Sequence, residues 1–459
     1  MGKRPKAKIV LIGAGSAVFT QGLIADFISS DVADWEIGLC DIDAEILTAI
    51  TLLAEKMVQE KGAQDRVSIA SSVDRRALLP DADFVVTTIA VGKRRAWEQD
   101  VFIPRKYGIY QPVGDSVMPG GISRAQRMIP AMIDIAKDVE DLCPDAFFFN
   151  YSNPMTSIVS AIRKTTNIKA IGLCHGVIQG EYYLANLLGV DKERLTAIGA
   201  GLNHLTFLFD IRVDGKSVKN RLREIASEQL SQTKGHEYNF WNRPMGENEK
   251  PHCLDNPFSW ELFLTYDAIP AVVDRHAVEF FPERFPGGAY YGHTLGVDAY
   301  SIERVIAHGD ETYEDLLANA KSEVKIDEML FNRSSGEHEQ LVEIIHSILF
   351  DERRVFSANM PNQGIIQGLP DDAILELPGA AMSTGFAQLH IEGFSSALQG
   401  IIAKKLAAIN LTVEAALEGN RRKWIEALLL DGAVNHRTEA EKMVDEFLKE
   451  FRIYLPQYT

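Results

Sequence analysis

The sequence predicts an α/β fold in which a doubly wound parallel β-sheet is followed by a mixed α+β domain. Two observations identify the sheet. Apolar runs ending in glycine or polar residues recur through residues 8–176, as expected for buried parallel strands. Segments with helical spacing of apolar residues separate most of these runs. A third observation is length: 459 residues are too many for one ordinary hydrophobic core. We therefore expect two domains, at residues 1–200 and 201–459.

The first strand is predicted at KIVLIGAG (residues 8–15), and SAVFTQGLIADFISS (residues 16–30) follows it as a helix. Five further strands are predicted at WEIGLCDID (35–43), RVSIASS (66–72), ADFVVTTIAVG (82–92), DAFFFNYSNP (145–154) and IKAIGLCHG (168–176). The amphipathic segment AEILTAITLLAEKMVQEKG (44–62) is predicted as one of the helices between them. From Ile401 onward, apolar residues recur at three- and four-residue spacing, which predicts helices.

The glycines after the first strand predict a dinucleotide site in a Rossmann-like domain. Gly13 and Gly15 allow a tight turn and a close approach of the backbone to a pyrophosphate, beside the N-terminus of the next helix. We expect Ser16 and Phe19, just beyond the turn, to line the same site. Asp41 ends the second strand, where an acid that binds the ribose belongs. A third glycine is absent, and a tight turn without a ligand is the alternative.

Composition excludes several classes of protein. The net charge of −17 argues against nucleic-acid binding. No apolar run is long enough to span a membrane, and the N-terminus lacks the features of a signal peptide. The four cysteines are widely spaced, which suits a reducing cytoplasm better than a disulfide framework. We expect a cytoplasmic protein that binds neither nucleic acid nor membrane.

Polar residues follow the later strands where those strands end. Asn150 and Asn153 follow the fifth strand, and Cys174 and His175 follow the sixth. Ligands of doubly wound sheets bind at these carboxyl ends. A cysteine and a distant histidine such as His204 are also common as ordinary buried residues, so both interpretations remain open at this point.

Several distinctive motifs follow one another from about residue 8 to residue 431. They are KIVLIGAGSAVFT, CDID, GDSVMPGGISRAQR (114–127), NYSNPM, GLCHG, GLNHLTF, DRHAVEFFP (274–282) and VEAALEGNRRKWIEALLLD. Together they resemble glycoside hydrolase family four, whose members depend on NAD and a divalent metal.

The resemblance implies metal ligands, cofactors and a mechanism. Cys174 and His204 match the family's metal ligands, and Mn²⁺ is the expected ion because substrate hydroxyls would add oxygen ligands. The implied reaction oxidises C3 of the sugar with NAD⁺, removes the C2 proton, eliminates the aglycone, adds water and returns the hydride. A homodimer or homotetramer is expected by the same analogy.

The catalytic acid and base are harder to assign. Some members use a tyrosine as the C2 base, in the segment before the DRH motif. No tyrosine of this chain aligns clearly with it, and Tyr266 is the nearby substitute. Asp274 fits the aspartate of other members, and its alternative is a structural acid paired with Arg275. Asp115 matches a family acid, assigned to leaving-group protonation or substrate binding; it could instead be a turn former.

We predict substrate contacts for Asn153, His175, Arg275 and Arg95. Each has an ordinary structural alternative, such as a turn former or a solvated cation. His175 after the metal cysteine, and GDSVMPGG, favour non-phosphorylated α-glycosides, as cleaved by α-galactosidases and α-glucosidases of the family. An α-galacturonidase or α-glucuronidase is the second candidate, with Arg275 or Arg95 binding the carboxylate.

Two interpretations of another kind remain open. The first domain would also suit an NAD-dependent 2-hydroxy acid dehydrogenase. The histidine motif of such dehydrogenases, however, has only a weak match in this chain, at Gly336-Glu337-His338. A non-catalytic NAD-binding protein is the other.

Overall fold

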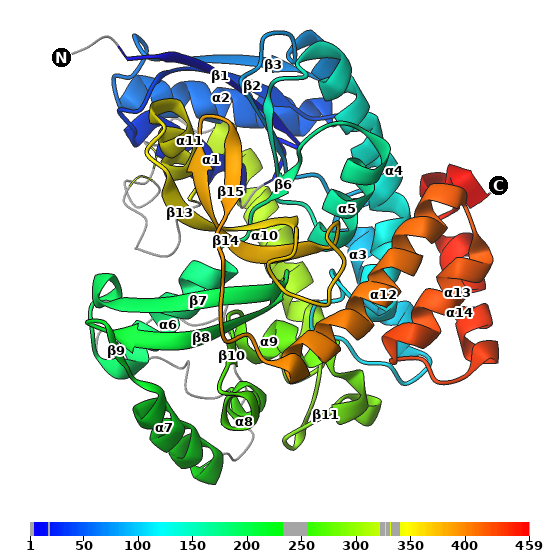
Figure 1. The fold of residues 1–459 in the computed structure, drawn as a ribbon. Coiled ribbons are helices and arrows are strands. Elements are labelled where there is room, and N and C mark those ends of the chain that lie inside the picture. Colours follow the sequence, from blue (N-terminus) through cyan, green and yellow to red (C-terminus); the bar gives the residue numbers. More distant parts are fainter. Residues whose placement is uncertain are drawn as a thin grey trace.

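The computed structural model describes residues 4–16, 19–232, 256–321, 326, 331 and 340–458. Their main feature is a 13-stranded mixed sheet with the order β10-β8-β7-β14-β13-β6-β5-β4-β1-β2-β3, to which β15 and β9 attach at the side. Figure 1 shows β1–β3 at one end of the molecule and the β7–β8 hairpin at the other, with β13 and β14 between them. The fourth cysteine, Cys253, and the Gly336-Glu337-His338 match lie outside the described residues.

The predicted parallel sheet is confirmed, with the order β6-β5-β4-β1-β2-β3 of a Rossmann-like fold. Its strands are β1 (Lys6–Ile12), β2 (Asp34–Cys40), β3 (Val67–Ser72), β4 (Phe84–Thr87), β5 (Phe147–Asn150) and β6 (Ile171–Gly172). The accompanying helices are α1 (Phe19–Ser29), α2 (Ala44–Glu60), α3 (Lys93–Arg105), α4 (Met118–Leu142), α5 (Met155–Thr165) and α6 (Gly176–Leu188). The strands near residues 82–92 and 168–176 are shorter than predicted, so the polar residues after them lie in loops.

Antiparallel strands extend the sheet beyond β6. They are β7 (Leu195–Leu202), β8 (Leu205–Val213), β9 (Lys216–Ser217), β10 (Ile269–Pro270), β13 (Arg354–Pro361), β14 (Ile374–Met382) and β15 (Gly385–Gln388); β11 (Ala289–Tyr290) and β12 (His293–Thr294) form a separate ribbon. β13 pairs with β6 through Asn359 and Gly172, and β14 pairs with β7 through Glu376 and Gly201. Two strands from late in the chain therefore join the two halves of the sheet.

The predicted C-terminal helices are observed, and they cover the first half of the molecule. The later helices are α7 (Lys219–Gln232), α8 (Pro257–Tyr266), α9 (Val273–Ala277), α10 (Ile302–Lys321), α11 (Leu341–Phe350), α12 (Ser396–Glu418), α13 (Arg421–Asp431) and α14 (Arg437–Glu450). α12 packs against α4 and α5, and α14 packs against α3 (Figure 1). The C-terminal segment is thus part of the same packed body as the parallel sheet.

The division at residue 200 stays a prediction, and residue 200 lies inside β7. Among the helices that the structure describes, none combines the length and apolar character needed to span a bilayer.

Candidate active site

The turn after β1 has the backbone geometry that the glycines predict. Gly13 and Ala14 each donate an N–H to the Cys40 carbonyl at 2.9 Å. Gly13 has a φ of +93°, and a Cβ there would lie 2.9 Å from the Ile89 backbone nitrogen. A side chain on Gly15 would lie 2.8 Å from Asp41 Oδ2. Both positions therefore need glycine, because a side chain there would collide with neighbouring atoms.

Asp41 lies against this turn. Its Oδ2 accepts the Gly15 N–H at 2.8 Å and its Oδ1 accepts the Asp43 N–H at 2.9 Å. Each carboxylate oxygen has a further lone pair, so the group can still accept two ribose hydroxyls. Ser16 accepts the Phe19 N–H at 3.3 Å, and the Phe19 ring lies 5.7 Å from that of Tyr151. The predicted cofactor residues are thus brought together.

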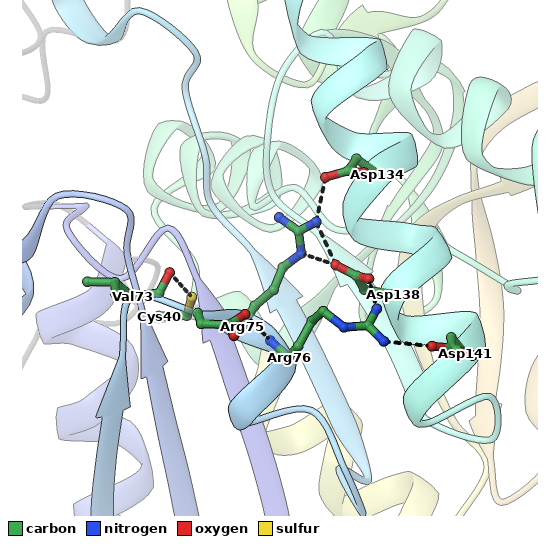
Figure 2. A network of polar contacts seen from close by, with 8 residues as sticks. Cys40, Val73, Arg75, Arg76, Asp134, Asp138 and Asp141 are labelled. Carbon is green, nitrogen blue, oxygen red and sulfur yellow. Dashed lines mark hydrogen bonds and ion pairs between the residues drawn. The ribbon is translucent and has the colours of Figure 1, made fainter.

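Two arginines that follow β3, Arg75 and Arg76, form ion pairs with acids of α4. Arg75 Nε donates to Asp138 at 2.6 Å, and its Nη2 contacts Asp134; Arg76 contacts Asp138 and Asp141. Figure 2 shows these three acids in a stripe along α4, with both guanidinium groups turned toward them and Cys40 close by. The positive charges of Arg75 and Arg76 are therefore neutralised by carboxylates of the protein itself.

His204 and Cys174 lie close together across the sheet. His204 is in the two-residue turn between β7 and β8, with a φ of +66°. Its Nδ1 lies 2.7 Å from Ser116 Oγ and 3.5 Å from Asp115 Oδ1. Burial acts to lower the pKa of His204, but the Asp115 carboxylate and the Cys174 thiol raise it well above its usual value. The predicted metal ligands are therefore neighbours in the fold.

Asp115 is the centre of this cluster. It accepts hydrogen bonds from Ser116 Oγ at 2.7 Å and from Asn153 Nδ2 at 3.0 Å. Burial would raise its pKa, but the nearby His204, His276 and Arg124 hold the pKa well below the ordinary value. Asn153 Oδ1 is buried and accepts no hydrogen bond from the described residues. A substrate hydroxyl would satisfy it.

His276 belongs to the cluster, although sequence reasoning did not select it. Its ring centroid lies 4.1 Å from that of His204. Ligand atoms of Asp115, His204 and His276 all lie within 4.8 Å of one another. Burial and the charge of His204 lower the pKa of His276, so its imidazole is neutral, whereas a metal ion bound to His204 would have to displace a proton. The signal in the sequence was a histidine in the same DRH motif as Asp274.

The donor set fits a divalent transition metal. Imidazole and thiolate suit such ions, and the Asp115 carboxylate adds the oxygen donor that Mn²⁺ prefers. These protein ligands come from loops and from α9, and sugar hydroxyls would add further oxygen ligands.

Asp274 lies in a closed hydrogen-bond network. Its carboxylate is fully buried and accepts bonds from Phe258 N (3.0 Å), Ser259 N (2.7 Å), Ser259 Oγ (2.6 Å) and Tyr290 OH (2.6 Å). Burial raises the pKa of Asp274 to about 6. These bonds join α9 to α8 and favour the structural alternative, with partners other than the expected Arg275. Its role as the base stays a prediction.

The predicted substrate residues differ in their surroundings. Asn153 lies in the cluster, His175 directly follows Cys174, and Arg275 influences the charge of the adjacent His276. Arg95 is different: its side chain is 61% exposed on α3 and pairs with Glu98 and Asp310. The geometry of Arg95 therefore favours the alternative of a solvated surface cation.

Glu279 supports the loop that carries Asp115. It is buried, and its Oε1 accepts the N–H groups of Val113 and Gly114, both at 2.8 Å. Burial and the negative charge of Asp115 raise the pKa of Glu279 to about 8.

We expect Glu279→Gln to stabilise the chelator-treated protein at pH 8.5 but not at pH 5. Between pH 4.5 and 8 the folded protein keeps a proton that the unfolded chain has lost. The free energy of unfolding of the wild type therefore falls across this range, by at most about 1.4 kcal/mol per pH unit. Urea denaturation at pH 5 and pH 8.5 measures the free energy of unfolding of the wild type and of Glu279→Gln. An equal difference at both pH values would show that Glu279 does not titrate in this way.

Two models of one protein family match this chain. The model "Family 4 glycosyl hydrolase" matches residues 8–190, and that of its C-terminal domain matches residues 199–434. An α-glucosidase of Erwinia rhapontici is 30% identical over 98% of both chains. An α-galacturonidase of Thermoanaerobacterium saccharolyticum is 27% identical over 99% of this chain and 97% of its own. Among solved structures, a 6-phospho-α-glucosidase from gut microorganisms, in complex with NAD and glucose-6-phosphate, has a TM-score of 0.83 at 22% identity, covering 99% of this chain and 100% of that one. This last likeness concerns the fold.

Proposed function

The chain belongs to glycosyl hydrolase family 4, and we propose that it hydrolyses non-phosphorylated α-glycosides, of α-glucosidase or α-galactosidase type, with NAD⁺ and Mn²⁺. One observation carries the proposal: Cys174, His204, Asp115 and Asn153 converge at the carboxyl edge of the parallel sheet. Membership of this family argues against the two other interpretations, a 2-hydroxy acid dehydrogenase and a non-catalytic NAD-binding protein.

The residues of the glycine turn would hold the dinucleotide. The backbone at Gly13 and Gly15 would approach the pyrophosphate, Ser16 and Phe19 would flank it, and Asp41 would accept the ribose hydroxyls. Cys174 and His204 would hold the metal ion, with Asp115 and His276 within reach. When bound, NAD⁺ supplies a reversible hydride acceptor and the metal supplies a positive charge that makes the adjacent C–H more acidic.

The side chains of the protein would orient the sugar and handle its protons. Asn153 can bind a hydroxyl through its unsatisfied Oδ1. For Asp115, leaving-group protonation and substrate binding are both proposed. Its low pKa supports substrate binding, because a carboxylate at neutral pH accepts hydrogen bonds and donates none. Asp274 is proposed as the base on the sequence motif alone.

Hydrolysis of 4-nitrophenyl α-glycosides tests this function. Cleavage should require both NAD⁺ and Mn²⁺ once bound cofactor and metal have been removed. Turnover by stripped enzyme without added NAD⁺ would contradict the redox mechanism. We also propose a cytoplasmic homodimer or homotetramer, which light scattering after size exclusion would measure.

Stripped enzyme is expected to bind NAD⁺ at least about ten-fold more tightly than NADP⁺. A 2′-phosphate would face the Asp41 carboxylate, while the positive charges of Arg75 and Arg76 are already paired with acids of α4 (Figure 2). Titration of intrinsic fluorescence with each nucleotide measures the two constants. Equal affinities would mean that a cation turns toward the ribose.

A further inference from the structure

Glu376 is a buried carboxyl group in the part of the sheet that joins its two halves. Its residue is 1% exposed and lies on β14 opposite Gly201 of β7, which in turn lies opposite Thr206 of β8. Residues opposite one another on neighbouring strands face the same side of a sheet. Because Gly201 has no side chain, the Glu376 carboxyl can reach across β7, and its Oε2 lies 2.6 Å from Thr206 Oγ1. A strand from late in the chain thus contacts the hairpin that carries His204.

The Thr206 hydroxyl closes the turn in which His204 lies. Thr206 Oγ1 donates to the Leu202 carbonyl at 3.0 Å, so one hydrogen bond joins the residues on either side of the turn. His204 has a φ of +66°. A residue with a side chain adopts this conformation at an energetic cost, and surrounding contacts have to maintain it. The contact with Glu376 anchors this closed turn to β14.

The hydrogen bonds around Thr206 indicate that Glu376 is a neutral carboxylic acid. A hydroxyl has one hydrogen to donate, yet Thr206 Oγ1 lies within hydrogen-bond distance of both the Leu202 carbonyl and Glu376 Oε2. Both contacts are hydrogen bonds when Glu376 donates to Thr206 and Thr206 donates to Leu202. Burial raises the pKa of Glu376, in agreement with this direction. Ser357 Oγ donates to the other carboxyl oxygen, Oε1, at 3.5 Å.

We propose that Glu376 is a positioning residue of the metal site, which acts through the Thr206 hydroxyl to fix the His204 turn. This inference rests on the proposed function, in which His204 holds the metal ion. In this role Glu376 supplies a hydrogen bond and no charge, so an amide would serve equally well and an aliphatic side chain would not. The competing interpretation is an ionised Glu376 that acts on His204 through its negative charge, since the charge of His204 acts to lower the Glu376 pKa.

The test pairs a conservative with a disruptive change at each position: Glu376→Gln with Glu376→Leu, and Thr206→Ser with Thr206→Val. Four quantities are measured on the full chain: the Mn²⁺ affinity, from the electron paramagnetic resonance of free Mn²⁺, the NAD⁺ affinity, kcat and KM for a 4-nitrophenyl α-glycoside, and the free energy of unfolding in urea. Ser347→Ala is the matched control. Ser347 is also buried, and its hydroxyl donates to the Ala381 carbonyl at 2.7 Å near the other end of β14.

We expect Glu376→Leu and Thr206→Val to lower the Mn²⁺ affinity by about 10–100-fold, as the loss of a group that orients a metal ligand does. Both variants should also have a lower kcat and an unchanged NAD⁺ affinity. Glu376→Gln and Thr206→Ser keep the hydrogen bonds, so their Mn²⁺ affinity should be close to that of the wild type. Ser347→Ala should lower the free energy of unfolding and leave the Mn²⁺ affinity unchanged.

Two outcomes would overturn the proposal. If Glu376→Gln weakens Mn²⁺ binding as much as Glu376→Leu, the negative charge of Glu376 is what the site requires. If Glu376→Leu and Thr206→Val bind Mn²⁺ like the wild type and only lose stability, as Ser347→Ala does, the contact supports the fold alone. Should Glu376→Leu not fold, the comparison of Thr206→Val with Thr206→Ser decides. A wild type that cleaves no glycoside would count against the proposed function, and the Mn²⁺ affinities would still decide the role of Glu376.

Discussion

Replacing Cys174 with serine is expected to lower kcat/KM by at least about 10³-fold and to weaken Mn²⁺ binding. The thiol lies beside His204 and contributes to the raised pKa of that histidine, so the two side chains are close enough to interact directly. Serine keeps the approximate size of the side chain but lacks the sulfur atom that would bind the metal. Titration followed by the electron paramagnetic resonance of Mn²⁺ would measure binding, and initial rates at saturating NAD⁺ would measure catalysis.

Cys143→Ser provides the control for this experiment. Cys143 is buried, and burial raises the pKa of its thiol to about 11, so it has no tendency to form a thiolate. Its replacement should lower stability slightly and leave the metal affinity unchanged. Full activity and unaltered Mn²⁺ binding in Cys174→Ser would exclude Cys174 as a ligand.

Replacing Asp100 with alanine is expected to destabilise the protein by about 3–5 kcal/mol. Asp100 and Arg127 form a pair without exposed surface, and the variant leaves the Arg127 guanidinium buried without its counter-ion. The free energy of unfolding from urea denaturation would measure the loss. The double variant Asp100→Leu with Arg127→Met should recover much of it, since it removes both charges.

Asp310→Ala is the matched control, because it also removes an acid that pairs with arginines. Asp310 pairs with Arg94 and Arg95 at the surface, where its side chain is 42% exposed. Such pairs contribute about 0–1 kcal/mol. Equal losses for Asp100→Ala and Asp310→Ala would mean that burial of the Arg127 pair does not determine its contribution.

The parallel half of the sheet could be predicted because its signals are local. Each strand is an apolar run, and the glycine turn requires a backbone conformation that glycine adopts readily. The place of Asp41 beside that turn follows from the parallel pairing of β1 with β2. The antiparallel half could not be predicted in this way, because β13 and β14 pair with strands far away in the sequence.

The site could be predicted where residue type alone is informative. The cysteine and the histidine after the strands left metal binding and ordinary burial both open, and the family resemblance decided between them; the second imidazole, His276, approaches only through tertiary packing. The sequence also does not distinguish a buried acid with four donors, such as Asp274, from an acid that faces a substrate. The same limit applies to cations, because the Asp310 carboxylate that pairs with Arg95 comes from a distant helix.

The insertion of β13 and β14 between β6 and β7 has a consequence for synthesis on the ribosome. Cys174 follows β6 and His204 follows β7, so both metal ligands are translated before the two strands that separate them in the sheet. A nascent chain that ends before residue 354 therefore carries both proposed ligands but lacks the two strands that lie between them in the sheet. We expect the proposed metal site to form only after β13 and β14 have been synthesised.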